Sequence, residues 1–223
     1  MIWAGMLFSI PCFFLDLKEF RSSHRLVFII LTLVSAVEFY GKYLGLRGIN
    51  NGWIYNIGAV YGETILILFF LAVAVNNQKS KFLLRSTAGA FFLYSIVYTI
   101  FFRPIDQFHN FSVTVASLLI IFGCFYYFFE IMFYDYYLEK QLWKIPDFWV
   151  ATLLLLFFSS SFLFFAFFPK VIAMDAKLWG TLNFMLKLIG GTMYLSFGLV
   201  YYLPLLREGN QDDFPNDLAT SKS

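Results

Sequence analysis

Three ionisable residues lie inside apolar stretches of the sequence, where a charge is energetically unfavourable: Glu38, Glu63 and Lys187. A charge at the centre of a bilayer costs about 2.5–3.5 kcal/mol on insertion scales. Since pairing opposite charges is the least costly way to keep them ionised, we expect Lys187 to face the bundle interior and to neutralise Glu38, Glu63 or both. Such a group binds a small ligand or a proton, or it only fixes the register of the helices.

Other polar and small residues share helical faces with these three. Lys42 follows Glu38 by four residues, which is an ordinary salt-bridge spacing, so Lys42 is an alternative partner for Glu38. Around Lys187, spacings of three, four and seven place further residues on one side of a helix: Gly180, Asn183, Gly190, Gly191 and Tyr194. The predicted ligand or proton site therefore comprises Glu38, Lys42, Glu63, Asn183 and Lys187.

Two pairs of glycines flank a turn between the two glutamates. Gly41 and Gly45 precede the sequence INNG at residues 49–52, and Gly58 and Gly62 follow it. Small residues four apart let helix backbones approach closely in lipid. We therefore expect a tight helical hairpin that holds its two carboxylates near one another.

The composition indicates a membrane protein. Of the 223 residues, 60% are hydrophobic and only 13% are charged, whereas a soluble domain carries about 25% charged residues. Seven apolar segments predict an all-α, polytopic membrane protein with a bundle of seven transmembrane helices. We place the segments at about 2–17, 26–45, 56–75, 82–102, 112–133, 148–168 and 178–203.

The first and last parts of the chain differ from the rest. The first segment is short for a hydrocarbon core of about 30 Å, so it either thins the bilayer or lies at its interface. We find no cleavable signal peptide and expect the N-terminus to be retained. Residues 1–206 form the predicted transmembrane domain, and residues 207–223 are polar and acidic, as in a disordered cytoplasmic tail.

Lysine and arginine in the loops predict the orientation. One side carries ten of them and the other side five, so the positive-inside rule places the N-terminus outside and the C-terminus in the cytoplasm of an inner membrane. With this topology Glu38, Glu63 and Lys187 share one layer in the outer half of the bundle. Glu130 falls at the cytoplasmic interface.

The chain offers little other chemistry. His24 and His109 fall on opposite sides and cannot share a metal, and no phosphate-binding or nucleophile motif occurs, so we expect no metal and no cofactor. A net charge of +2 without a basic stripe argues against nucleic acid. A lipid-modifying enzyme using Glu38 and Glu63 stays an alternative. The serines at 159–161 bond their own helix or line a pocket.

Two stretches carry a resemblance to a known family. They are the sequence NNGWIYN at residues 50–56, followed by Glu63, and DFWVATLLLLFFSSSFLFF at residues 147–165. Both resemble a family of uncharacterised small seven-helix membrane proteins of Bacteroidota. Leu153 and Ser160 stand where that family tends to have small residues. Members often look to be encoded beside histidine kinases, so the resemblance implies signalling but no established activity.

We therefore expect a membrane sensor or signalling accessory protein with a polar pocket in its outer half. A partner would contact the cytoplasmic loops at 76–85 and 134–147. A small-solute or proton-coupled transporter is the alternative, although no internal repeat supports it. A structural subunit of a larger membrane complex is the second alternative.

Overall fold

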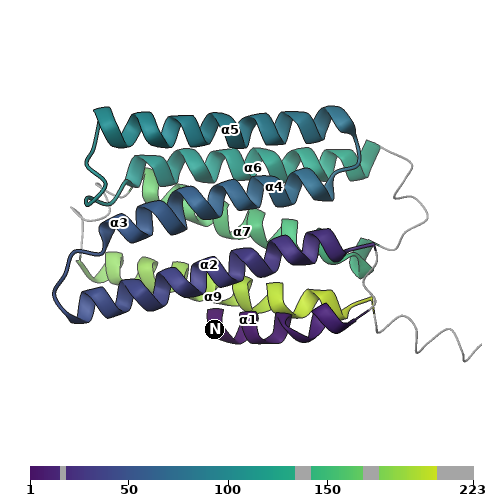
Figure 1. Ribbon diagram of the computed structural model, residues 1–223, viewed down its shortest axis with the longest axis horizontal. Coiled ribbons are helices and arrows are strands. Elements are labelled where there is room, and N and C mark those ends of the chain that lie inside the picture. Colours follow the sequence, from purple (N-terminus) through teal and green to yellow (C-terminus); the bar gives the residue numbers. More distant parts are fainter. Residues whose placement is uncertain (16–18, 134–141, 168–175, 205–223) are drawn as a thin grey trace, which may run out of the picture.

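The computed structural model describes residues 1–15, 19–133, 142–167 and 176–204. Within these ranges the chain is all helical and forms one bundle of seven helices (Figure 1). Six helices are long and apolar enough to cross a membrane, which confirms the predicted fold class. Their bounds are α2 Arg21–Leu46, α3 to α4 Gly52–Ala74, α5 Gln78–Phe101, α6 Asn110–Phe133, α7 Pro146–Ala166 and α9 Ala176–Leu199.

The first helix is the exception in length. Helix α1 covers Ile2–Ser9, and a single turn of 3₁₀ helix, η1, covers Pro11–Phe14. Together they extend for only about 20 Å at 1.5 Å per residue, as the sequence predicted for this segment. In Figure 1, α1 lies beside one half of α9, and the chain begins near the middle of the bundle. Helix α1 does not extend along the other half of α9.

The turn between α2 and α3 forms one residue earlier than the sequence suggested. Gly48 has a φ of +70°, so it takes the left-handed conformation that ends a helix. The amide of Gly48 donates to the carbonyl of Gly45, and the amide of Ile49 donates to the carbonyl of Leu44, both at 3.0 Å. Gly48 therefore makes the reversal, and Gly52 already begins α3.

The third crossing changes its helix type along its length. Short helix α3, Gly52–Ile54, continues into a π-helix, η2, at Tyr55–Gly62, and then into α4, Glu63–Ala74. Helix α4 lies at the centre of the hydrophobic core, where Ile67, Leu68, Phe70 and Leu71 are fully buried. Glu63 stands at the junction between the wide π-helix and the regular α-helix.

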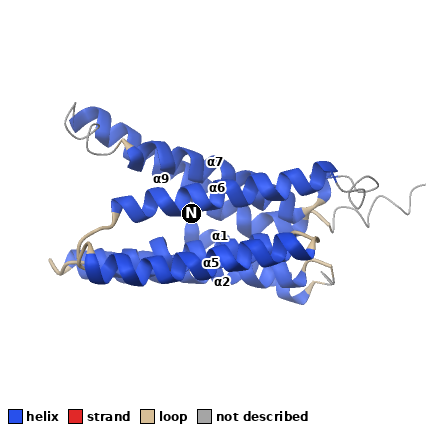
Figure 2. Ribbon diagram, turned by 90° about the horizontal axis from the view of Figure 1, so that it is seen from above, coloured by secondary structure: helices blue, strands red, loops and turns tan. Residues whose placement is uncertain are grey.

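The helices diverge at one end of the bundle. Seen from above, α7 and α9 incline away from the other helices toward the end that carries the connection between α2 and α3 (Figure 2). We call this the hairpin end; it also carries the loop at residues 102–109. No residue from Trp179 to Ile189 is buried, whereas Met193, Tyr194, Phe197 and Gly198 are buried. Helix α9 is thus loosely packed in its first half and tightly packed in its second half.

Three of the four paired glycines are closely packed: Gly41, Gly58 and Gly62, where a Cβ would lie 3.2 Å from Leu33 on α2. A Cβ on Gly58 would overlap the side chain of Val37, and a Cβ on Gly41 would lie 2.7 Å from the Tyr55 hydroxyl. Gly45 meets only Asn51, at 3.5 Å. The tight hairpin predicted from these glycines is therefore confirmed, with Gly41 and Gly58 as its closest points.

The C-terminal part of α9 packs on α1 as closely as the two helices of the hairpin pack on each other. A Cβ on Gly198 would overlap the carbonyl oxygen of Gly5, and a Cβ on Gly5 would overlap the carbonyl oxygen of Tyr194. The two backbones therefore touch at this crossing. The predicted tail at 207–223 and most of the predicted partner loop at 134–147 lie outside the described residues.

Candidate functional site

A cavity of about 1000 Å³ opens between the two diverging groups of helices. One wall consists of α2, η2 and the start of α4, and the opposite wall consists of α7 and α9. Residues Met1, Ile2 and Trp3 of the α1 segment also line it. Because α7 and α9 incline away near the hairpin end, the cavity occupies the space that a parallel bundle would have filled with side chains.

Four of the five residues predicted from the sequence line this cavity. They are Glu38 and Lys42 on α2, Glu63 on α4 and Lys187 on α9. The fifth, Asn183, is half-buried and does not line it. Residues from the second, third and last crossings thus line one cavity, but they do not share the one layer that the sequence predicted, because Lys187 lies about 10 Å along α9 from Tyr194, the partner of Glu63. Whether they bind a ligand or a proton stays a prediction.

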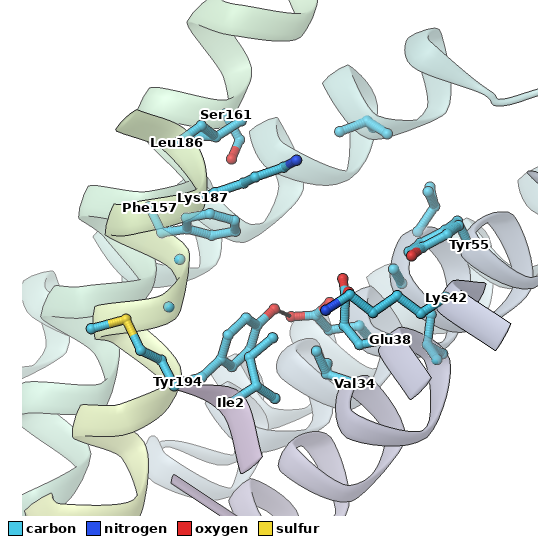
Figure 3. Close-up of a pocket in the computed structure, with 18 of the residues that line it drawn as sticks. Ile2, Val34, Glu38, Lys42, Tyr55, Phe157, Ser161, Leu186, Lys187 and Tyr194 are labelled. Atoms are coloured by element: carbon cyan, nitrogen blue, oxygen red, sulfur yellow. Dashed lines mark hydrogen bonds between the residues drawn. The ribbon is translucent and has the colours of Figure 1, made fainter. Parts of the chain in front are cut away.

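Glu63 forms the most definite contact at the cavity. Its carboxyl is only 4% exposed, and its Oε1 accepts a hydrogen bond of 2.5 Å from the hydroxyl of Tyr194 (Figure 3). Tyr194 shares a helical face with Lys187 in the sequence, but its role as the partner of Glu63 was not foreseen.

The predicted pairing of Lys187 with Glu38 or Glu63 is wrong. In the described part of the chain, no carboxylate forms an ion pair with Lys187. The reason is the position of Tyr194 opposite Glu63: Lys187 precedes Tyr194 by seven residues, or about 10 Å along α9. Lys187 therefore lies about two turns nearer the hairpin end than Glu63, on a wall that inclines away. Its side chain points into the cavity (Figure 3).

Glu38 and Lys42 occupy the α2 wall. Glu38 is half-buried and Lys42 is exposed, and Figure 3 shows the ammonium end of Lys42 beside the Glu38 carboxyl. Among the described residues these two side chains form no ion pair at hydrogen-bonding distance. Their opposite charges still offset one another across the shared turn of helix.

A serine on α7 adds a polar group to the opposite wall. Ser160 bonds its own helix, with its hydroxyl donating to the carbonyl of Leu156 at 2.9 Å. Ser161 differs, because its hydroxyl oxygen is buried, lines the cavity and has no hydrogen-bond partner in the part of the chain described. The two outcomes that the sequence left open for the serines are therefore both found, at neighbouring positions.

The π-helix is fixed in place by a network at the hairpin end. The side-chain amide of Asn56 donates to the carbonyls of Ile105 and Gln107, each at 2.7 Å, and its oxygen accepts from the amide of His109 at 3.0 Å. The ring of His109 is fully buried. Its Nε2 lies 3.0 Å from the carbonyl of Pro104, so Nε2 carries the proton and Nδ1 accepts from Tyr61.

A second polar cluster lies at the end away from the hairpin. Asp147, on the first turn of α7, accepts from Ser23 on α2 at 2.9 Å and from Tyr201, after α9, at 3.2 Å. Nearby, Nε2 of His24 lies 3.1 Å from the carbonyl of Ser9, which ties α1 to α2. This cluster joins four helices and lies outside the cavity.

Glu130 lies near the end of α6, and its predicted place at the membrane interface stays a prediction. Its side chain is 2% exposed, and its Oε1 accepts from the backbone amides of Asn76 and Asn77 before α5. The carboxyl satisfies amides at a helix start that have no partner within the helix. Glu130 therefore closes the connection between α4 and α5.

Comparison with known proteins gives no assignment. No family model matches the chain, and neither a curated protein nor a solved structure is significantly similar to it. Arguments about function therefore rest on the cavity and on the helices around it.

Proposed function

We propose that the protein is a membrane sensor or signalling accessory whose cavity binds a ligand and whose α9 responds to it. The observation that supports this most is the cavity itself, about 1000 Å³ with two acids and two lysines on its walls. A space of this size is at the upper end of small-molecule pockets, about 300–1000 Å³. A membrane protein that only required a stable core would gain packing by closing it.

Helix α9 is the element that we expect to move. Its second half is held by Tyr194 on Glu63, by the backbone contact of Gly198 with Gly5 and by Tyr201 on Asp147. In its first half, the residues from Trp179 to Ile189 are not buried. A ligand that contacts Lys187 would pull the loose half inward, and the change would reach the held half through Tyr194.

The direction of signalling follows from the predicted topology. In our proposal the hairpin end faces outward and the cluster around Asp147 faces the cytoplasm, where a partner would bind. A neighbouring histidine kinase is the partner class implied by the resemblance to the Bacteroidota family, and that resemblance stays a prediction.

A distance measurement tests the response of α9 without knowledge of the ligand. Ala59 lines the cavity from η2, so Ala59→Phe would fill part of the space as an occupant would. Spin labels would be placed on cysteines introduced at Phe184 in the loose half and at Leu93 on α5, both well exposed. The native Cys12 and Cys124 are buried and should stay unlabelled. We expect Ala59→Phe to narrow or shift the distribution of distances between the labels at Phe184 and Leu93.

Two controls make this measurement specific. A label pair at Leu199 and Leu83 reports on the held half of α9 and should change less than the first pair. Ala90→Phe, at an exposed position on α5, adds the same ring outside the cavity and should leave both pairs unchanged. If Ala59→Phe and wild-type protein give superimposable distributions for the first pair, α9 does not respond to filling of the cavity and the proposal fails.

A transporter is the second candidate, favoured by the position of Glu63 in the cavity wall beside a stretch of π-helix. Irregular helices near the middle of the membrane are typical of transporters. Proteoliposomes containing a pH-sensitive dye would report proton flux. Flux that Glu63→Gln abolishes would favour the transporter, and no flux above empty liposomes would favour the sensor.

A further inference from the structure

We propose that the ligand of the cavity is a single-chain amphiphile with an anionic head group, which enters sideways from the bilayer. This inference rests on the proposed function, because it names the ligand class of the same cavity. Three features of the described residues support it: the charge on the α7–α9 wall, the apolar remainder of the lining and the short first helix.

The head group is assigned to Lys187 and Ser161. They lie on α9 and α7, and Figure 3 shows the Lys187 ammonium and the Ser161 hydroxyl on the same side of the cavity. The described residues provide no ion-pair partner for Lys187 and no hydrogen-bond partner for the Ser161 hydroxyl. An ammonium and a hydroxyl together suit a carboxylate or a phosphate, which accepts hydrogen bonds from both.

The other lysine of the cavity has an acid on its own helix. Lys42 follows Glu38 by four residues, so their opposite charges offset one another, whereas Lys187 has no acid on its own helix face. About two turns deeper, the Tyr194 hydroxyl already donates to Glu63, so it is not available to a second acceptor. The anionic head group is therefore expected at Lys187, toward the hairpin end, and not at the level of Glu63.

The chain of the amphiphile would lie in the apolar part of the cavity. That part is lined by Ile2, Val34, Val37, Phe157 and Phe158. A short hydrophilic anion would leave this surface without an apolar partner. A hydrocarbon chain would supply that partner.

The path of entry lies beside the start of the short first helix. Helix α1 contacts α2 and α9, and Met1 lines the cavity and lies against Gly191. The cavity is also lined by Phe39 and Leu46 on α2, which are 62% and 89% exposed, so it opens to the outside of the bundle along α2. Trp3 and Phe39 contact each other edge to face at this opening, with ring centroids 6.0 Å apart. A lipid chain could pass here without crossing water.

Photolabelling in nanodiscs of phosphatidylcholine tests the ligand class. The probe is hexadecanoic acid with a diazirine on its chain, and labelled residues are located by mass spectrometry. We expect labels on cavity residues such as Val34 and Phe157. Unlabelled hexadecanoate should compete, whereas hexadecanol, which lacks the charge, should compete at least about tenfold less effectively. Butyrate, a soluble anion with a short chain, should not compete.

Matched variants test the two anchoring residues. Lys187→Gln and Ser161→Ala should each reduce cavity labelling at low probe concentration, with the larger loss, about tenfold, for Lys187→Gln. Lys79→Gln removes an exposed lysine at the far end of the bundle, and Ser160→Ala removes a hydroxyl that bonds its own helix, so both should label as wild type does.

Different failures carry different meanings. Equal competition by butyrate or by hexadecanol would overturn the amphiphile class or its charge, while the cavity would remain a ligand site. Unchanged labelling of Lys187→Gln would overturn the assigned head-group position. Labels confined to outward-facing positions, such as Phe92 and Leu93, would overturn the inference. Cavity labelling with no change in the Phe184–Leu93 distance would instead refute the sensor while leaving the ligand class in place.

Discussion

Two tyrosines one heptad apart on the last crossing each donate a hydrogen bond to a buried carboxyl group, but in different surroundings. Tyr201 donates to Asp147, which also accepts from Ser23, so both carboxylate oxygens have partners in a closed cluster. Tyr194 donates to Glu63, which has one such bond and borders a cavity of about 1000 Å³. The carboxyl of Asp147 therefore has a hydrogen-bond partner on each oxygen, whereas the carboxyl of Glu63 has a partner on one oxygen and borders the cavity.

We infer from this difference that the two halves of α9 have different roles: the second half holds the fold together, and the first half can respond to a ligand. Around Asp147 the helices are held by side-chain bonds on several elements and by the contact of Gly198 with Gly5. Toward the hairpin end, from Ile189 back to Trp179, α9 has no buried residue. Asp147 therefore holds the fold together, whereas Glu63 stands where a ligand can change its surroundings.

The largest expected effect is from removal of the closed carboxyl. Asp147→Ala leaves the hydroxyls of Ser23 and Tyr201 buried without an acceptor, so we expect a loss of about 3 kcal/mol in the free energy of unfolding. Reversible unfolding in mixed micelles measures it. Glu63→Ala should cost less, about 1 kcal/mol, because Tyr194 then faces the cavity. Equal losses for the two variants would remove the distinction between the carboxyls.

A smaller loss in the free energy of unfolding is expected from glycine substitutions that compare the two halves of α9. Gly198→Leu forces α1 away from α9, because even a Cβ overlaps the carbonyl of Gly5, so we expect a loss of about 2 kcal/mol. At Gly180 a Cβ has no neighbour within 4 Å, so Gly180→Leu should stay within about 0.5 kcal/mol of wild type. The same unfolding assay compares them. A large loss for Gly180→Leu would show that the first half is packed after all.

Removal of single tyrosine hydroxyls should separate stability from motion. Tyr201→Phe and Tyr194→Phe each remove one hydrogen bond to a carboxyl, worth about 1 kcal/mol. Only Tyr194→Phe should broaden the distance distribution between labels at Phe184 and Leu93, because the contact of Gly198 with Gly5 separates Tyr201 from the loose half of the helix. Broadening of similar size in both variants would contradict Tyr194 as the pivot.

The smallest expected effect on stability is at the serines of α7. Ser161→Ala removes a buried hydroxyl without a hydrogen-bond partner in the described residues, so the free energy of unfolding should stay within about 0.5 kcal/mol or rise slightly. Ser160→Ala is the control. A marked destabilisation of Ser161→Ala alone would indicate that its hydroxyl has a structural partner.

The fold could be predicted from the sequence because it follows from the length and spacing of apolar segments. The bilayer forces each such segment into a helix, since every backbone polar group must be satisfied internally. The short first segment was also recognised, because its apolar run ends early. The convergence of Glu38, Glu63 and Lys187 on one space followed from the expected crossing directions.

The partners within the site could not be predicted in the same way. Sequence spacing gives the face of a helix but not its tilt, and the inclination of α9 decides that Tyr194, not Lys187, stands opposite Glu63. The π-helix at Tyr55–Gly62 likewise depends on the bonds of Asn56 to a distant loop. The cluster around Asp147 could not be predicted either, because its partners Ser23 and Tyr201 come from distant segments.

A density map of the full-length protein in nanodiscs of native lipid tests the central claim most directly. We expect α9 to incline away from α2 beyond Tyr194, with elongated density in the cavity that begins beside Lys187 and Ser161 and continues toward Val34. A map in which the side chains of α2 and α9 interlock along their whole length, leaving no space around Glu38 and Lys187, would contradict it.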